Sequence, residues 1–168
     1  QTCALPIFAI QPDGRLLIGG AFNSVNGTNW NGIGRLNIDG SLDTTFNPRA
    51  GASGPVNVVR VQTDGKILIA GEFLAVDNAS RPRIARLNID GSLDTSFDPG
   101  TGADNSIRAL ELQPDGKIII AGRFQSFNGT PVPYVARLNT DGSLDTSFAP
   151  LSGPDGVVHA IGIQADGR

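Results

Sequence analysis

The residues of this 168-residue chain with the most chemical potential are carboxylates that recur at a fixed spacing. Asp39 and Asp43 lie four residues apart, and Asp13 precedes them. Paired carboxylates can serve as acid and base or nucleophile in glycoside hydrolysis. Each of the three has a counterpart 51 residues later, so a catalytic role would imply an active site in every copy. We therefore interpret them as structural and assign no catalytic residue.

The segment 37–43 also resembles a calcium loop, because oxygen-bearing side chains alternate along it. A full Ca²⁺ site needs six or more oxygen ligands and usually a bidentate Glu, which this segment lacks. The competing interpretation is a β-turn in which Asp39 bonds to its own backbone and Asp43 pairs with Arg35. We favour the turn and assign neither a metal nor a cofactor.

Nucleophilic catalysis finds little support, since the chain has one histidine, His159, and one cysteine, Cys3. Residues 1–7 resemble a translated sequencing adapter, and we expect them to be foreign to the protein. The alternative is a genuine first strand, because the apolar positions of 5–10 align with those of 56–61. The chain starts without Met and stops inside a repeated motif, so we expect a truncated reading frame.

The composition limits the partners. A net charge of −3 with no basic run argues against nucleic acid and anionic membranes. No signal peptide or transmembrane run is visible, but this absence carries no information because we expect the true N-terminus to be missing. We expect no membrane insertion. The 22 Gly and 11 Pro residues punctuate the chain at regular intervals, which is typical of a turn-rich β protein.

Internal repetition organises the chain. The segment 35–46 recurs as 86–97 and 137–148, a step of 51 residues because 86 − 35 = 51 and 137 − 86 = 51. This spacing predicts three structural units at 1–51, 52–102 and 103–153, and the opening of a fourth at 154–168.

One repeat reads as four strands. In the second copy, apolar and β-branched runs at 56–62, 66–73, 83–88 and 92–97 are separated by Asp-Gly turns and one wide polar connection. No 3.6-residue period is present. We predict an all-β fold, namely a β-propeller fragment of three four-stranded antiparallel blades plus the first strand of a fourth, forming an open arc.

The tight turns have a predictable register. A three-residue loop at 89–91 places Leu87 opposite Leu93 and Arg86 opposite Asp94, whereas a two-residue loop would bury Asp94 beside Leu87. We choose the longer loop, which requires a left-handed backbone at Gly91 and its equivalents. Asn-Gly pairs in the wide connections are also expected to be turns.

Strand directions sort the loops onto two faces. Both Asp-Gly turns of each blade fall on one face. The wide connections at 24–32, 75–83 and 126–134 fall on the other, with the linkers at 48–55, 99–106 and 150–157. The turns repeat almost letter for letter and the wide connections vary, so we expect ligand selectivity on the second face.

Residues that break the repeat are the candidate ligand contacts. Exposed aromatic side chains beside Arg suit protein or carbohydrate partners. The candidates in the wide connections are Trp30, Arg81, Arg83 and Tyr134. Those in one column at the start of the first strands are Asn57, Arg108 and His159. Drift in unconstrained loops is the alternative explanation for this variation.

The repeated pattern around 11–22 and 35–46 resembles the delta-60 repeat, a β-propeller repeat of unknown function. The resemblance implies a large secreted or surface-attached bacterial protein, hence an extracellular or cell-surface location. It defines no catalytic residues. We therefore expect a non-enzymatic scaffold or binding platform that also contacts neighbouring blades of the full-length protein. The alternative is a fragment of a polysaccharide-active propeller enzyme whose catalytic residues lie in other blades.

Overall fold

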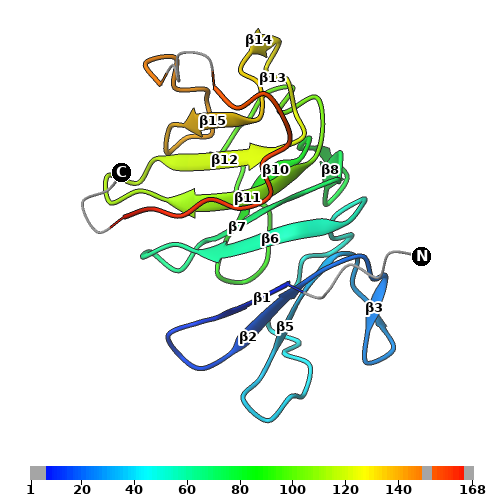
Figure 1. Cartoon of the computed structure of the whole chain (residues 1–168). Coiled ribbons are helices and arrows are strands. Elements are labelled where there is room, and N and C mark those ends of the chain that lie inside the picture. The colour runs from blue at the N-terminus through cyan, green and yellow to red at the C-terminus, as the bar shows by residue number, and fades with distance from the viewer. Residues whose placement is uncertain (1–6, 149–152, 165–168) are drawn as a thin grey trace.

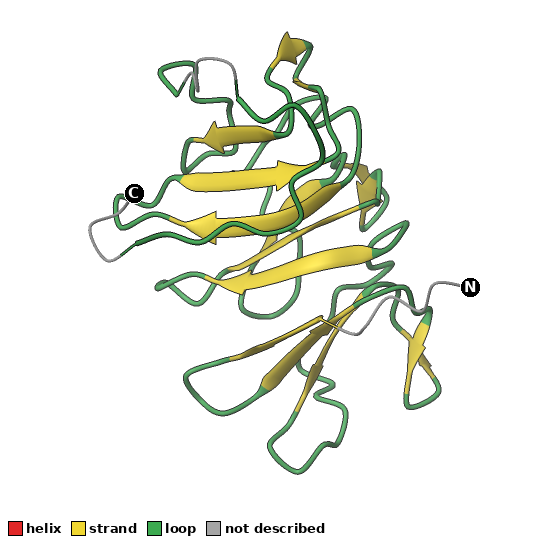
Figure 2. Cartoon of the chain, in the orientation of Figure 1, coloured by secondary structure: helices red, strands yellow, loops and turns green. Residues whose placement is uncertain are grey.

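A computed structural model of the chain describes residues 7–148 and 153–164 (Figure 1). All regular structure in these residues is β-strand (Figure 2). Within the described part of the chain no helix is long and apolar enough to cross a membrane. Short β-branched runs between Asp-Gly turns explain the strand content, since such runs favour pleated, half-buried structure.

Each repeat forms a three-stranded antiparallel sheet and a separate two-stranded hairpin. The main sheets consist of β1 (Ile7–Ile10), β2 (Leu16–Gly19) and β5 (Ile33–Leu36) in blade 1; β6 (Val56–Val61), β7 (Ile67–Gly71) and β10 (Ile84–Leu87) in blade 2; and β11 (Ile107–Leu112), β12 (Ile118–Gly122) and β15 (Val135–Leu138) in blade 3. The hairpins are β3 (Ser24–Val25) with β4 (Thr28–Asn29), β8 (Ala75–Val76) with β9 (Ala79–Ser80), and β13 (Ser126–Phe127) with β14 (Thr130–Pro131). The predicted open arc of antiparallel blades is confirmed (Figure 1).

The fourth strand of each blade is shorter than predicted. It is reduced to one bridge, Leu87 with Leu93 in blade 2, and equivalent bridges occur in the other blades. Asp94 ends the pairing, because its Oδ1 accepts hydrogen bonds from the backbone N and Oγ of Ser96. This local turn competes with continuation of the strand.

The predicted first strand of a fourth blade is not formed as a strand, since the described residues 153–164 contain no strand. The segment nevertheless lies where that strand was expected. Val158 N donates to Gly122 O at 3.2 Å, just as Val56 N donates to Gly20 O at 3.2 Å at the junction between blades 1 and 2. The segment 153–164 therefore takes the place of a first strand beside blade 3. No described strand pairs with it to form a hydrogen-bonded ladder.

The predicted turn register is confirmed in all three blades. Leu87 lies opposite Leu93, and Asn88 pairs with Ser92, which leaves a three-residue loop. The loop glycines have left-handed φ angles of 82° at Gly40, 87° at Gly91 and 94° at Gly142. Glycine adopts this conformation without the steric penalty of a Cβ.

The hydrophobic core lies between blades rather than within them. One cluster joins Leu17, Ile33 and Phe46 of blade 1 to the sheet of blade 2. A second joins Leu68 and Phe97 of blade 2 to the sheet of blade 3. Each blade therefore depends on its neighbours to cover both faces of its sheet, as in other stacked repeat architectures.

Candidate functional site

Asp94 shows what the repeated carboxylates do. Its Oδ2 accepts hydrogen bonds from Arg86 Nε at 2.7 Å and Lys66 Nζ at 2.8 Å. The predicted Arg–Asp pairs form in every blade, each with a nitrogen–oxygen distance of 2.7 Å. All three carboxylates are almost fully buried. Their oxygens are thus engaged by donors of the protein itself.

This environment keeps the carboxylates ionised. Burial opposes ionisation of Asp94, but hydrogen bonds from Lys66, Ser96 and Arg86 outweigh it and hold the pKa well below the ordinary value of 3.8. The pKa of Asp145 is lowered chiefly by its hydrogen bond from Lys117. A carboxylate that stays ionised at neutral pH is a poor proton donor.

Hydrogen bonds on the turn face also join neighbouring blades. Arg35 Nη1 donates to Ile89 O of the next blade at 2.8 Å, and Arg86 Nη1 donates to Thr140 O at 2.7 Å. These contacts favour a structural role for the repeated charges. Among the described residues, no group of three or more His, Cys, Asp or Glu side chains is arranged to hold a metal ion.

The opposite face, here called the wide-loop face, is built from the wide connections and the inter-blade linkers. The linkers 48–55 and 99–106 each pair with the hairpin of the following blade, through bridges between Ala52 and Val76 and between Ala103 and Phe127. Two-residue turns close the hairpins, with left-handed φ angles of 48° at Asn26 and 54° at Asn128. The predicted grouping of wide connections and linkers is confirmed for 48–55 and 99–106, and part of the linker at 150–157 lies outside the described residues.

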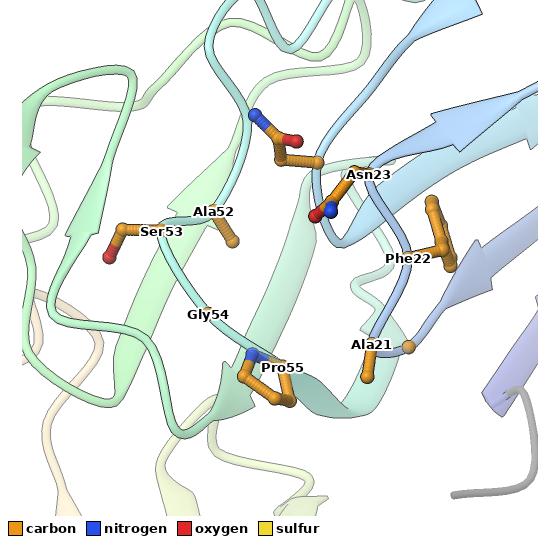
Figure 3. Close-up of a pocket in the computed structure, with 9 residues that line it drawn as sticks. Ala21, Phe22, Asn23, Ala52, Ser53, Gly54 and Pro55 are labelled. Atoms are coloured by element: carbon orange, nitrogen blue, oxygen red, sulfur yellow. The ribbon is translucent and has the colours of Figure 1, made fainter. Parts of the chain in front are cut away.

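A pocket of 380 Å³ opens on this face between blades 1 and 2 (Figure 3). Its walls are the strand end and loop 20–23, Asn31, and the linker residues 52–55. In Figure 3 the amide of Asn23 points into the space, whereas the ring of Phe22 points away from it. The lining offers amide and backbone groups but no ionisable side chain, so the pocket is suited to hydrogen bonding rather than to acid–base chemistry.

Trp30 is buried, and its expected exposure to a ligand is wrong. Only 6% of its surface is exposed, and its ring meets Phe46 edge-on with centroids 6.2 Å apart. The wide connection folds back as the β3–β4 hairpin, which turns Trp30 into the junction between blades 1 and 2. A large aromatic side chain gains more from filling this junction than from a solvent-facing position.

Arg81, Arg83 and Tyr134 are half-buried on the wide-loop face. Arg81 Nη1 donates to Ser80 O at 2.7 Å, and Arg83 Nη1 donates to Glu72 O. Arg83 and Tyr134 have left-handed φ angles of 69° and 66°, in a column where blade 1 has Gly32. None of these side chains lines the pocket.

The column at the start of the first strands bridges neighbouring blades. Asn57 Nδ2 donates to Ile107 O at 3.1 Å, and Arg108 Nη1 lies 3.1 Å from His159 Nδ1. The structure thus brings Arg108 and His159 together and places Asn57 at the preceding junction. It does not bring this column together with the candidates of the wide connections.

Sequence reasoning missed the pocket residues Phe22 and Asn23. Phe22 aligns with Phe73 and Phe124, which are fully buried, so its type indicated core. Ala21 could have indicated the pocket from sequence, because the equivalent positions of the other blades carry the larger residues Glu72 and Arg123. The smallest side chain of that column leaves room beside the linker.

Comparison with known protein families bears directly on the repeats. A model described as a domain of unknown function (DUF5122) beta-propeller matches residues 11–46, 62–97 and 113–148. The chain belongs to this family. The three matches confirm the resemblance to the delta-60 repeat, which is the same kind of repeat under another name. A search of curated proteins finds no match for this DUF5122 chain.

Proposed function

We propose that this DUF5122 chain is a non-enzymatic binding platform of a secreted or surface-attached bacterial protein. In this proposal the turn face holds the blades in a fixed arrangement and the wide-loop face receives a protein or carbohydrate ligand. The observation that carries the proposal is the pocket between blades 1 and 2, which lies on the face whose loops differ from blade to blade.

The chemistry of the pocket favours an uncharged hydrogen-bonding ligand. Asn23 and Asn31 provide amide groups, and Gly54 and Pro55 form an apolar edge. Asn31 is held by its own contact, since its Nδ2 donates to Ala50 O at 2.9 Å. Such a combination suits sugar hydroxyls or a peptide backbone, and it offers no charge to attract a polyanion.

Ala21→Arg tests the pocket with a side chain that another blade of this protein already carries at the equivalent position. Blade 3 carries Arg123 at the equivalent position, so the blade tolerates the substitution, while the longer side chain fills the space beside 52–55. Thr28→Arg is the matched control, because it adds the same charge at the exposed β3–β4 hairpin outside the pocket.

The measurement is binding of each variant to an array of neutral bacterial oligosaccharides and to extracellular peptides. We expect Ala21→Arg to weaken binding by about tenfold or more and Thr28→Arg to leave it close to wild type. Exchange of 24–32, 75–83 and 126–134 for one common loop should abolish selectivity in the full-length protein. If the Ala21→Arg variant and the loop-exchanged protein both keep their fold and bind as strongly as wild type, the ligand site lies elsewhere.

A further inference from the structure

Asn-Gly bonds in the chain can undergo a covalent change that needs no enzyme. The chain has three of them, Asn26-Gly27, Asn31-Gly32 and Asn128-Gly129. The backbone nitrogen of the residue after an asparagine can attack the side-chain amide, and glycine hinders this attack least because it has no Cβ. The structure around each bond then decides whether it reacts in the folded protein.

Asn128-Gly129 is open to this reaction. The pair forms the two-residue turn between β13 and β14, with left-handed φ angles of 54° and 77°. Both residues are exposed, and a Cβ placed on Gly129 would meet nothing within 4 Å. Within the described residues, Gly129 N donates no hydrogen bond and Asn128 Nδ2 has no acceptor. The attacking nitrogen and the leaving group are thus both unhindered.

Asn31-Gly32 shows the opposite arrangement and serves as an internal reference. Asn31 Nδ2 donates to Ala50 O at 2.9 Å, and Gly32 N donates to Phe22 O at 2.9 Å. Gly32 is buried, and an added Cβ would lie 3.2 Å from Ala52 Cβ. Because these contacts hold both reacting groups, attack at Asn31 requires the junction between blades 1 and 2 to open.

Blade 2 carries an aspartate at the position where the reaction forms one in blade 3. Asp77 is the equivalent of Asn128 and has a φ of 48°. Its carboxylate lies 3.7 Å from Nε of Arg49 in the preceding linker. This turn therefore accommodates an aspartate at its first position.

The linker of blade 3 contacts Asn128 in its own way. Asn128 Oδ1 accepts hydrogen bonds from Thr101 N and Thr101 Oγ1, both at 2.9 Å. Asn128 N donates to Gly102 O at 2.8 Å. A carboxylate formed at this position keeps both Thr101 donors, but Gly100 stands in the linker where blade 2 has Arg49.

We propose that Asn128 deamidates in the folded protein and that Asn31 does not. A bond forms between Gly129 N and Asn128 Cγ, Gly129 N gives up its proton, and the bond from Cγ to Nδ2 breaks as ammonia leaves. Water then opens the resulting succinimide at one of its two carbonyl groups, which yields aspartate or isoaspartate. Asn26-Gly27 forms the same turn in blade 1 and should react as well.

Cyclisation needs the turn to open locally, with release of the Thr101 contacts. The tip can open at little cost because neither Asn128 nor Gly129 belongs to a hydrophobic cluster. Asn128 should thus react more slowly in the folded protein than in the unfolded chain, yet faster than Asn31.

The two products differ in their effect on the wide-loop face. Aspartate adds one negative charge and leaves the backbone unchanged. Isoaspartate adds a methylene group to the backbone of a two-residue turn, and this disturbs the pairing of Phe127 with Thr130 and the hydrogen bond to Gly102 O. Slow conversion of Asn128 to isoaspartate therefore loosens the β13–β14 hairpin from its linker.

The test is peptide mapping by mass spectrometry of the folded chain during several weeks in mildly alkaline buffer. We expect Asn128 to deamidate about tenfold or more faster than Asn31. In concentrated urea the two rates should become similar, because unfolding removes the contacts that protect Asn31. A folded protein in which Asn128 is no faster than Asn31 would overturn the proposal.

Gly129→Asn tests the chemistry at the turn itself. Blade 2 carries Asn78 at this position with a φ of 62°, so the turn accepts the side chain. The added Cβ hinders the attack, and the reaction at Asn128 should slow by about tenfold or more. Gly162→Asn is the matched control and should leave the rate unchanged, since a Cβ at Gly162 meets nothing within 4 Å. Equal rates in both variants, with unchanged circular dichroism, would contradict attack by Gly129 N.

Asn128→Asp separates the two products. This variant should melt at the temperature of the unreacted protein, whereas aged protein enriched in isoaspartate should melt at a lower one. Identical melting of the aged and unreacted proteins would overturn the loosening of the hairpin.

Discussion

The arginine of each tight hairpin makes several of the contacts that stabilise this fold. Arg86 is buried, pairs with Asp94, lies 5.0 Å from the centre of the Phe97 ring and donates to Thr140 of the next blade. One side chain thus fixes the hairpin, the core aromatic ring and the junction. Such a buried guanidinium is tolerated because its charge and its donors are satisfied together.

Removal of the Asp94 charge should therefore destabilise the protein strongly. Asp94→Asn leaves Arg86 and Lys66 without their ionised partner, and we expect a loss of about 3–5 kcal/mol in the free energy of unfolding. Asp98→Asn is the control, because Asp98 is 69% exposed and lies 4.0 Å from Arg81. That change should cost less than about 1 kcal/mol in urea unfolding experiments. Equal effects of the two substitutions would contradict a structural role for the buried pair.

The same carboxylates predict the response to acid. The pKa values of Asp43, Asp94 and Asp145 in the folded protein are lowered from 3.8. A lowered folded-state pKa adds stability that is present above the unfolded pKa and is lost as pH falls through the folded one. The free energy of unfolding should thus fall steadily below about pH 4. Asp94→Asn should make this slope shallower, and an unchanged slope would contradict the assignment.

Residue identity predicted some of these features and not others. Arg86 and Asp94 repeat together, and only one hairpin register pairs them, so sequence was enough. Trp30 was misplaced because its column holds Arg81 and Val132 in the other blades, so its type gave no sign of a buried position. Its burial depends on a neighbouring blade, which local pattern does not encode.

At the scale of elements, hairpins were predictable and strand lengths were not. Asp-Gly turns between apolar runs fix both loop length and register. The fourth strand was overestimated, because Asp94 and Ser96 divert the backbone into a turn after a single bridge. Side-chain competition of this kind is decided by tertiary partners, which the apolar pattern of 92–97 does not reveal.

Two chemically identical turns should respond differently to one substitution. Gly40 and Gly91 are both left-handed, at 82° and 87°, so alanine should cost each about 1–2 kcal/mol. A Cβ at Gly40 meets nothing within 4 Å, whereas at Gly91 it approaches the backbone N of Asn47 in the preceding blade at 3.0 Å. Gly91→Ala should therefore cost at least about 1 kcal/mol more in the free energy of unfolding.

Gly162→Ala serves as the baseline for this pair, because its φ lies outside the left-handed region and its added Cβ meets nothing within 4 Å. Urea unfolding of the three variants measures the difference. Equal losses of unfolding free energy for Gly40→Ala and Gly91→Ala would show that the preceding blade does not contact the turn at Gly91.

At the scale of the whole molecule, the two faces of the arc differ in how closely they repeat from blade to blade. The turn face repeats one set of contacts at each junction, and the hydrophobic clusters lie between neighbouring sheets. The wide-loop face varies and holds the pocket. The repeat length predicted the blades and the two faces. It did not predict the pocket, which depends on how Ala21 and the linker of another blade meet.

The central claim is that one inter-blade junction is repeated along an open arc of blades. A crystal structure of the chain tests this claim most directly. We expect Arg35 Nη1 within hydrogen-bond distance of Ile89 O, Arg86 Nη1 equally close to Thr140 O, and three sheets related by the same rotation at both junctions. Blades that close into a three-membered ring, or arginines whose guanidinium groups contact only their own hairpin, would contradict the account.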